Sequence, residues 1–234
     1  MDNLPGRDAK GFQNTETVVP PPDGEPKPMP LFTQYHFPHY GDAVLLIIPT
    51  SNEHKTQILL AAFESQKPAN VSMHHIVIPA ESEVGEQPYD GAGVLGAYNR
   101  ISNALQALAT SPENQAVFTK ERIGTVIAAS IENYIQAAGV PRAVDYGVVM
   151  VHNATTGQTV TGISRGVTVP QAFVARARLD GFEDEDRSHG KVTVGSILAA
   201  GVSGLDKADW HAVLAGTSRY DLLKETIDAL AIPW

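Results

Sequence analysis

The stretch Ala43-Val44-Leu45-Leu46-Ile47-Ile48-Pro49-Thr50-Ser51-Asn52-Glu53-His54-Lys55 decides the fold class. Six consecutive apolar residues followed by a polar turn predict a buried strand over 43–48. The next segment, 55–66, repeats its apolar side chains at helical spacing and predicts a helix. A strand, a turn and a helix in this order are the unit from which α/β domains are built.

The same alternation of short apolar runs and longer helical runs continues along the chain. Further strands are predicted over 75–78, 125–131, 145–151 and 158–164, and helices are predicted over 95–108, after Pro170, after Thr193 and after Ser218. The turn-rich link 153–157 joins the last two strands and is typical of a hairpin, so the sheet should be mixed. We therefore predict one α/β domain with a central mixed sheet flanked by helices.

The composition excludes several classes of protein. With 43% hydrophobic and 18% charged residues in a chain of 234, there is enough apolar material for one well-buried core, which excludes a wholly disordered protein. A formal net charge of −9 disfavours binding to nucleic acid and to anionic membrane surfaces. The absence of cysteine excludes disulfides, thiolate metal sites and thiol catalysis.

The first 40 residues differ from the rest in composition. Seven of the 16 prolines fall before residue 31. We predict a flexible, partly polyproline-II tail over 1–40, either an inert linker or a docking ligand for an aromatic groove, followed by the α/β domain over 41–234. The N-terminus shows no signal-peptide pattern and the apolar runs are too short to span a membrane, so a cytoplasmic protein without direct membrane insertion is expected. The acidic run 180–186 predicts a solvated loop, with a metal cluster as the alternative.

Three polar residues at the first turn are candidates for phosphate binding. Ser51, Asn52 and Lys55 fall between a strand and a helix, where backbone N–H groups and the helix dipole favour an anion. The alternative interpretation is structural, because serine and asparagine also cap ordinary helices and lysine is a common surface residue.

A second group of candidates combines an acid with basic residues. Glu132 follows an apolar run and should sit at the carboxyl end of a strand, where it could hold Mg²⁺ or simply form a salt bridge. Arg100 and Arg219, the latter next to the predicted cap Ser218, could clamp an anion or lie on the surface.

Taken together, these motifs resemble the inosine/xanthosine triphosphatases. The resemblance is carried by Ser51-Asn52-x-x-Lys55, Gln87-Pro88, Gly96-Ala97-x-x-Arg100, Ile131-Glu132, Val144-Asp145 and Thr217-Ser218-Arg219, in this order over 43–231. A sister branch, the C-terminal domain of the proline-rich and coiled-coil-containing proteins of the early secretory pathway, is more similar still. That similarity lies in Ile131-Glu132-Asn133-Tyr134-Ile135, Val192-Thr193-Val194-Gly195, Asp209-Trp210-His211 and Gly216-Thr217-Ser218-Arg219.

The resemblance implies an elongated α/β fold with a cleft between two lobes, paired as a homodimer. In the hydrolase branch the cleft binds a purine nucleoside triphosphate, with the residues matching Ser51, Asn52 and Lys55 near the phosphates. Arg100, Ser218 and Arg219 match further phosphate-side positions, and Glu132 matches an acidic ligand of Mg²⁺ or Mn²⁺. The secretory-pathway branch implies a regulatory or scaffold role near the Golgi or ER exit sites, with a kinase regulatory subunit or a coat protein as partner.

The chain departs from the hydrolase pattern at two places. Ala92-Gly93-Val94-Leu95 stands where the hydrolases carry an acidic pair, and Asn133-Tyr134 replaces a small Ser-Gly pair. Loss of a carboxylate weakens metal binding, Tyr134 should intrude on the pocket, and Asp90 is the nearest carboxylate that could substitute. We therefore expect a non-catalytic, regulatory or scaffold domain, which either still binds a nucleotide or keeps these residues only as helix caps. The alternative is a Mg²⁺-dependent hydrolase of inosine or xanthosine triphosphate.

Overall fold

The computed structural model describes residues 29–182 and 188–234, so the first 28 residues and most of the acidic run lie outside it. The main sheet has the order β2-β1-β4-β5-β6, with β7 also paired to β5. Its strands are β1 (Ala43–Ile48), β2 (Met73–Val77), β4 (Ile123–Gln136), β5 (Val144–Asn153), β6 (Thr159–Ile163) and β7 (Val167–Thr168). Strands β1, β2 and β4 run parallel, whereas β5 is antiparallel to β4, β6 and β7. The predicted mixed α/β sheet is thus confirmed.

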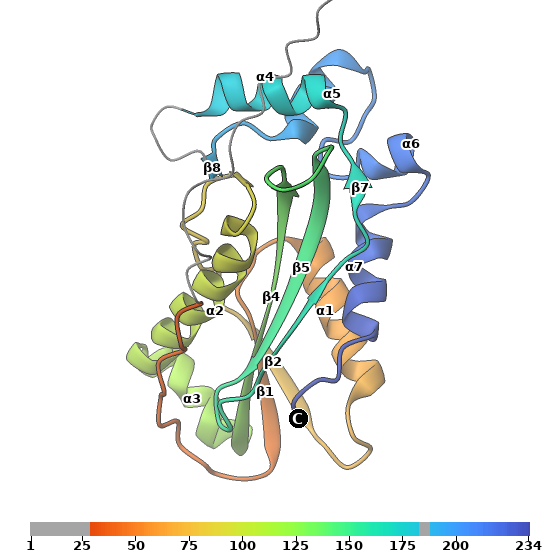
Figure 1. Ribbon diagram of the computed structural model, residues 1–234. Helices are drawn as coiled ribbons and strands as arrows, with labels where there is room; N and C mark the ends of the chain where they lie inside the picture. The colour runs from red at the N-terminus through yellow and green to blue at the C-terminus, as the bar shows by residue number, and fades with distance from the viewer. Residues whose placement is uncertain (1–28, 183–187) are drawn as a thin grey trace, which may run out of the picture.

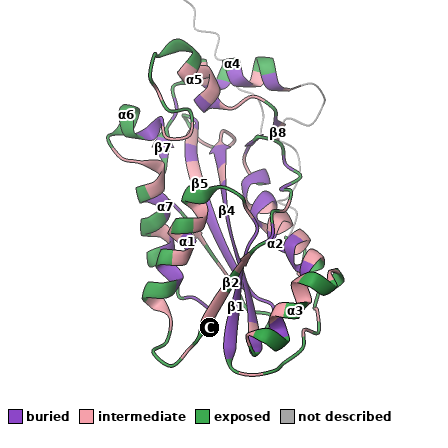
Figure 2. Ribbon diagram, turned by 180° about the vertical axis from the view of Figure 1, so that it is seen from behind, coloured by how far each residue is buried: buried purple, intermediate pink, exposed green. Residues whose placement is uncertain are grey.

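Helices cover both faces of this sheet (Figure 1). Their bounds are α1 (Glu53–Gln66), α2 (Ala92–Thr110), α3 (Pro112–Lys120), α4 (Gln171–Gly181), α5 (Val194–Gly201), α6 (His211–Ala215) and α7 (Arg219–Asp228). Helices α1 and α7 pack on one face and α2 and α3 on the other, which places the strands in the buried centre of the molecule (Figure 2).

The apolar run of β1 is explained by this two-sided cover. Ala43, Leu45 and Ile47 point into the core beneath α2 and α3, and the alternate residues point into the core beneath α1 and α7. Successive side chains of a strand face opposite sides of the sheet, so a strand covered on both sides has to be apolar throughout.

A third core lies where β4 and β5 extend past β1. The short antiparallel pair β3 (Gln87–Pro88) and β8 (His189–Gly190) lies here, together with α4, α5 and α6 (Figure 1). Trp210, Tyr89 and Leu198 are buried in this third core. The sheet and this additional group of elements enclose the cavity described below.

Residues 29–40, which the composition assigns to the tail, pack against the domain. Phe32, Tyr35 and Phe37 contact the core beneath α2 and α3, and the Tyr40 backbone N–H donates to the Ile123 carbonyl at 2.8 Å. The segment also lines an apolar groove of about 500 Å³.

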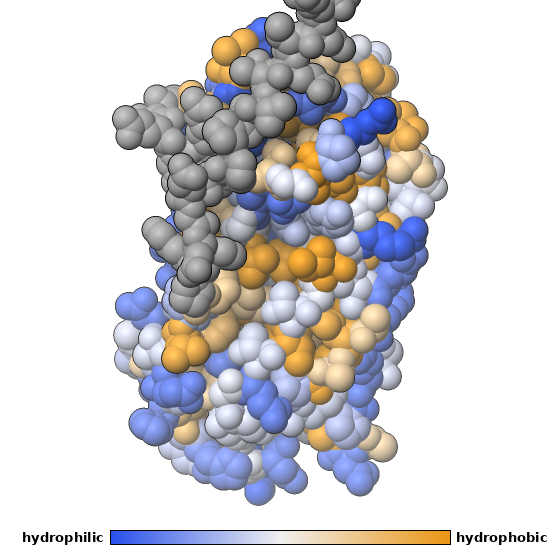
Figure 3. Space-filling view, viewed as in Figure 1, coloured by the Kyte–Doolittle hydropathy of each residue, from blue (hydrophilic) through white to orange (hydrophobic). Residues whose placement is uncertain are grey.

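In the space-filling view, apolar side chains gather across the middle of the molecule and polar ones dominate its lower end (Figure 3).

Within the described residues, no helix is both long and apolar enough to cross a membrane.

The burial of His152, on which Phe32 stacks, gives the stability of the fold a pH dependence. The two ring centroids are 4.0 Å apart, and burial lowers the pKa of the His152 imidazole to about 4. In the unfolded chain the His152 imidazole is protonated below about pH 6.5, whereas in the folded chain it stays neutral down to about pH 4. The free energy of unfolding therefore falls as the pH is lowered from about 6.5 toward 4. We expect this residue to account for at most about 3 kcal/mol of the loss by pH 4.

Comparing urea unfolding of the parent and His152→Gln across this pH range tests the assignment. The glutamine amide can keep the 2.8 Å hydrogen bond to Thr159 Oγ1 but cannot titrate, so the variant should lose that part of the pH dependence. His36→Gln, at an exposed site, serves as the matched control and should behave as the parent. Equal pH dependence in all three proteins would contradict the prediction.

Candidate anion-binding site

A cavity of about 410 Å³ opens beyond the carboxyl end of β1, between the sheet and the elements of the third core. This is the edge of a parallel sheet at which α/β proteins bind their ligands. The charged residues lining the cavity are Lys55, Arg100, Lys207, Arg219, Glu81, Glu86 and Glu132. Among these, Glu132 is the buried acid, whereas Glu81 and Glu86 are exposed to solvent.

Five of the residues predicted from sequence meet in this cavity, and three do not. Those that line it are Asn52, Lys55, Arg100, Glu132 and Arg219. Ser51 is exposed beside it, and Ser218 lies one residue outside its wall. Asp90 is turned to a different part of the structure.

Three helices begin at the cavity wall. Asn52 caps α1, its Oδ1 accepting from the Lys55 backbone N–H at 3.0 Å, and Thr193 caps α5, its Oγ1 accepting from the Ser196 N–H at 3.0 Å. The first residue of α7, Arg219, also lines the cavity. Each N-terminus carries a partial positive charge, so their convergence favours an anion. Part of their backbone donors are already used, since the Val194 N–H donates to Gln87 Oε1 and the Arg219 N–H to the Asp209 carboxylate.

Lys55 contributes a cation from a partly desolvated position. Its Nζ donates to the Ile131 carbonyl at 2.9 Å. Burial lowers the pKa of the Lys55 ammonium, Glu132 opposes this effect, and nearby Arg100 and Arg219 reinforce it. A bound anion would relieve the repulsion among these cations, so this lysine gains more from a ligand than a solvated surface lysine would.

Glu132 is held by Arg100 and lies within a strand. The prediction that it follows the strand is wrong, since β4 continues to Gln136 through its pairing with β5. The Glu132 Oε2 accepts from Arg100 Nε at 2.6 Å, and Arg100 Nη1 donates to the Ala80 carbonyl, also at 2.6 Å. The arginine is thereby fixed between a carboxylate and a main-chain oxygen.

Tyr134 does not intrude on the cavity, contrary to expectation. Its ring packs over Gly93 of α2, where a Cβ would lie 2.3 Å from the ring, and it stacks on Tyr146 at 5.8 Å. Tyr134 points to the same face of β4 as Glu132 but two residues further along, so it fills the core beneath α2. Asn133 lines the cavity instead.

Asp90 does not replace the missing acidic ligand. Its Oδ1 accepts from the backbone N–H groups of Ala137 and Ala138 at 2.7 and 2.8 Å, and its own backbone adopts φ = 54°. The carboxylate therefore closes the loop after β4. Over residues 29–182 and 188–234, no three or more His, Cys, Asp or Glu side chains are grouped so as to hold a metal ion. The described residues do not fit a metal centre ligated by the protein.

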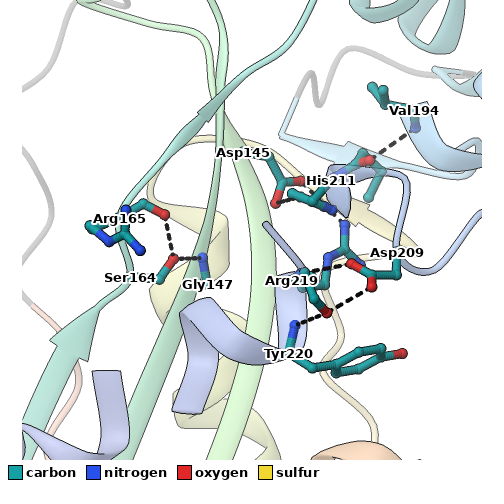
Figure 4. A network of polar contacts seen from close by, with 11 residues as sticks. Asp145, Gly147, Ser164, Arg165, Val194, Asp209, His211, Arg219 and Tyr220 are labelled. Carbon is teal, nitrogen blue, oxygen red and sulfur yellow. Dashed lines mark hydrogen bonds and ion pairs between the residues drawn. The ribbon is translucent and has the colours of Figure 1, made fainter. Parts of the chain in front are cut away.

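Arg219 is anchored from behind by a network of acids (Figure 4). Its backbone N–H donates to Asp209 Oδ1 at 2.6 Å, and Ser218 Oγ donates to Asp209 Oδ2 at 2.7 Å. Its guanidinium Nη2 lies 3.5 Å from Asp145 Oδ2, and Asp145 Oδ1 is 2.9 Å from His211 Nε2. Ser218 also caps α7 through the Tyr220 N–H at 3.1 Å, as its sequence position predicts.

Several residues in and near the cavity are not indicated as ligands by the sequence patterns. Lys207 reaches it without any motif that marks it, and the N-terminus of α5 belongs to the motif Val192-Thr193-Val194-Gly195, to which the resemblance gives no ligand role. Gly195 lies so close to the Lys207 carbonyl that a Cβ would stand 2.0 Å from it, a contact visible only in three dimensions. Asp145 carried a usable signal, because a lone acid in an apolar strand has to be paired when buried.

These features define an α/β domain with a cationic cavity at the edge of its sheet. No family model matches the chain. The fold is similar to that of the crystal structure of protein VC0702 from Vibrio cholerae, with a TM-score of 0.54 and 17% sequence identity, covering 79% of this chain and 90% of that chain. At this level of identity the similarity shows the fold alone.

Proposed function

We propose that this domain is a regulatory or scaffold module that binds the polyphosphate chain of a purine nucleotide without hydrolysing it efficiently. The observation that carries the proposal is the meeting of three helix N-termini with Lys55, Arg100, Lys207 and Arg219 at one cavity. Such a set of donors and cations is suited to a multiply charged anion. The purine part of the proposal rests on the resemblance to the inosine/xanthosine triphosphatases.

The lack of efficient hydrolysis is inferred from the state of the acids. Activation of water by a divalent ion needs carboxylates that are free to hold it. Glu132 is already paired with Arg100, and Asp90 with two backbone N–H groups.

A Mg²⁺- or Mn²⁺-dependent hydrolase is the second candidate. One observation favours it: Glu81 and Glu86 line the same cavity as Glu132 and are exposed, so they are available to an incoming metal–nucleotide complex. Such a hydrolase would have to use a metal ion brought by the nucleotide, because among the described residues these carboxylates do not form a group that could hold an ion by themselves.

Thermal unfolding and turnover measurements separate the two candidates. Inorganic triphosphate and the triphosphates of inosine, xanthosine and guanosine should each raise the melting temperature by about 5–10 °C at 100 times Kd, with or without Mg²⁺ or Mn²⁺. Phosphate and pyrophosphate release should not exceed that of Lys55→Met. Metal-dependent turnover that disappears in Glu132→Gln would establish the hydrolase instead, and the absence of any stabilisation would contradict both candidates.

The cellular part of the proposal follows from the secretory-pathway resemblance. It places a homodimer in the cytoplasm, peripherally at the Golgi or ER exit sites, with a kinase regulatory subunit or a coat protein as partner. Light scattering of the purified chain and capture with the purified regulatory subunit test these two statements. A monomer that does not bind the subunit would contradict them while leaving the cavity's ligand to be decided separately.

A further inference from the structure

Asp145 and His211 form a buried acid–imidazole pair immediately behind the cavity. Only 4% of Asp145 and 1% of His211 is exposed. The imidazole is stacked on Trp210, with the ring centroids 3.8 Å apart, and its Nε2 is 2.9 Å from Asp145 Oδ1. Burying an acid in the third core is costly unless it is fully paired, so the second oxygen also needs a partner.

That partner is the guanidinium of Arg219, which lines the cavity. Arg219 Nη2 lies 3.5 Å from Asp145 Oδ2, while Arg219 Nε is buried and has no hydrogen-bond acceptor among the described residues. Figure 4 shows Asp145 and His211 on one side of this arginine and Asp209 on the other. Among the described residues the guanidinium therefore makes one ion pair, with Asp145.

The position of Asp145 is fixed by rigid elements. It lies in β5, directly opposite Ile135 of β4 and also paired with Val167 of β7. His211 occupies one carboxylate oxygen and so limits rotation of the side chain. A carboxylate held in this way defines where an arginine can rest, and an arginine that is held loses less conformational entropy when it binds an anion.

We propose that Asp145, oriented by His211, is a positioning residue that holds the Arg219 guanidinium ready for a ligand phosphate. This inference rests on the proposed binding function. It makes a counterintuitive prediction: removing the negative charge of Asp145 weakens anion binding, because loss of the arginine's position outweighs the gain in positive potential.

The test is a double-mutant cycle measured by calorimetry with inorganic triphosphate. Asp145→Asn should weaken binding about tenfold in the parent and should not weaken it in an Arg219→Ala background. Glu225→Gln, which removes an exposed acid elsewhere on α7, serves as the matched charge control and should leave affinity within about twofold.

A second measurement reports on Arg219 without any ligand. The ¹⁵Nε–Hε signal of this arginine, assigned by its loss in Arg219→Lys, should be ordered and slow to exchange in the parent and should become mobile in Asp145→Asn. His211→Gln, which keeps a donor for the carboxylate, should retain most of the order if Asp145 Oδ1 needs only a hydrogen bond. His211→Ala, which removes this donor, should loosen the Arg219 signal and weaken triphosphate binding, and it replaces Asp145→Asn should that variant fail to fold.

The outcomes distinguish the positioning role of Asp145 from the proposed binding function. Tighter triphosphate binding by Asp145→Asn, or an Arg219 signal that the substitution leaves unchanged, would overturn the positioning role. If Asp145→Asn does not fold, His211→Ala decides the question. An Arg219 signal and a triphosphate affinity equal to those of the parent would then overturn the positioning role. A parent protein that binds no triphosphate would instead overturn the proposed function.

Discussion

Lys55→Met is expected to weaken binding of inorganic triphosphate about 100-fold while leaving the domain folded. Lys55 lines the cavity, and its Nζ donates to the Ile131 carbonyl of β4 at 2.9 Å, which fixes the position of the ammonium group. A charge-assisted hydrogen bond in a desolvated site contributes about 1.5–3 kcal/mol, and 100-fold corresponds to about 2.7 kcal/mol. Methionine keeps most of the length and apolar contact of the lysine stem.

The same substitution should stabilise the ligand-free fold at neutral pH. Burial lowers the pKa of Lys55. The unfolded chain keeps the Lys55 proton up to about pH 10.5, whereas the folded chain loses it at a lower pH. The charged lysine therefore costs stability below its folded-state pKa, and this cost is relieved as the pH rises toward about 10.5. The difference in unfolding free energy between Lys55→Met and the parent should accordingly narrow at alkaline pH.

Calorimetric titration with triphosphate and urea unfolding across this pH range measure both effects. Lys120→Met removes a lysine whose side chain is 79% exposed and which does not line the cavity, so it is the matched control. Binding by Lys55→Met that equals binding by the control would show that the anion does not occupy the cavity.

The local patterns predicted the framework of the fold well. The strand over 43–48 and the helix that follows it are confirmed because each depends on its own periodicity and on a cap, Asn52, within the same segment. The hairpin of β5 and β6 is confirmed for the same reason. By contrast, Phe32 packs on Tyr98 and His152, which are far away in the sequence. A local sequence pattern therefore cannot predict this packing.

The site was predictable only in part. Lys55, Arg100 and Arg219 come from three separate helices, and spacing alone gave no reason to bring them together; the family resemblance did. Asp90 does not line the cavity, because its left-handed backbone turns the carboxylate toward Ala137, which closeness in sequence to α2 does not indicate. Lys207 was missed because it belongs to a loop whose position depends on the tertiary fold.

Glu132→Gln is expected to tighten metal-free triphosphate binding about tenfold and to destabilise the ligand-free protein. The Glu132 carboxylate accepts from Arg100 Nε at 2.6 Å and is the buried acid among the cavity residues, so it acts as an internal counter-ion. Its removal leaves the arginine's charge unbalanced until an anion arrives, which adds about 1.4 kcal/mol to binding for each tenfold gain. Unlike Arg219, Arg100 keeps its position in this variant, because its Nη1 still donates to the Ala80 carbonyl.

The cost to the ligand-free fold has the same origin. Arg100 is 24% exposed at its side chain and would be left without its carboxylate partner, which we expect to lower the unfolding free energy by about 2 kcal/mol and the melting temperature by several degrees. Saturating triphosphate should recover most of this loss, because the ligand replaces the missing negative charge. The variant should therefore show a larger ligand-induced rise in melting temperature than the parent.

The sign of the affinity change separates a counter-ion from a metal ligand. If Glu132 held Mg²⁺ or Mn²⁺, the glutamine variant would bind the metal–nucleotide complex more weakly and would be unaffected with metal-free triphosphate. If Glu132 is a counter-ion, the glutamine variant binds triphosphate more tightly than the parent, both with and without the metal. Titrations of parent and variant with inorganic triphosphate, with and without Mg²⁺, thus decide the role of Glu132 even if neither protein hydrolyses a nucleotide.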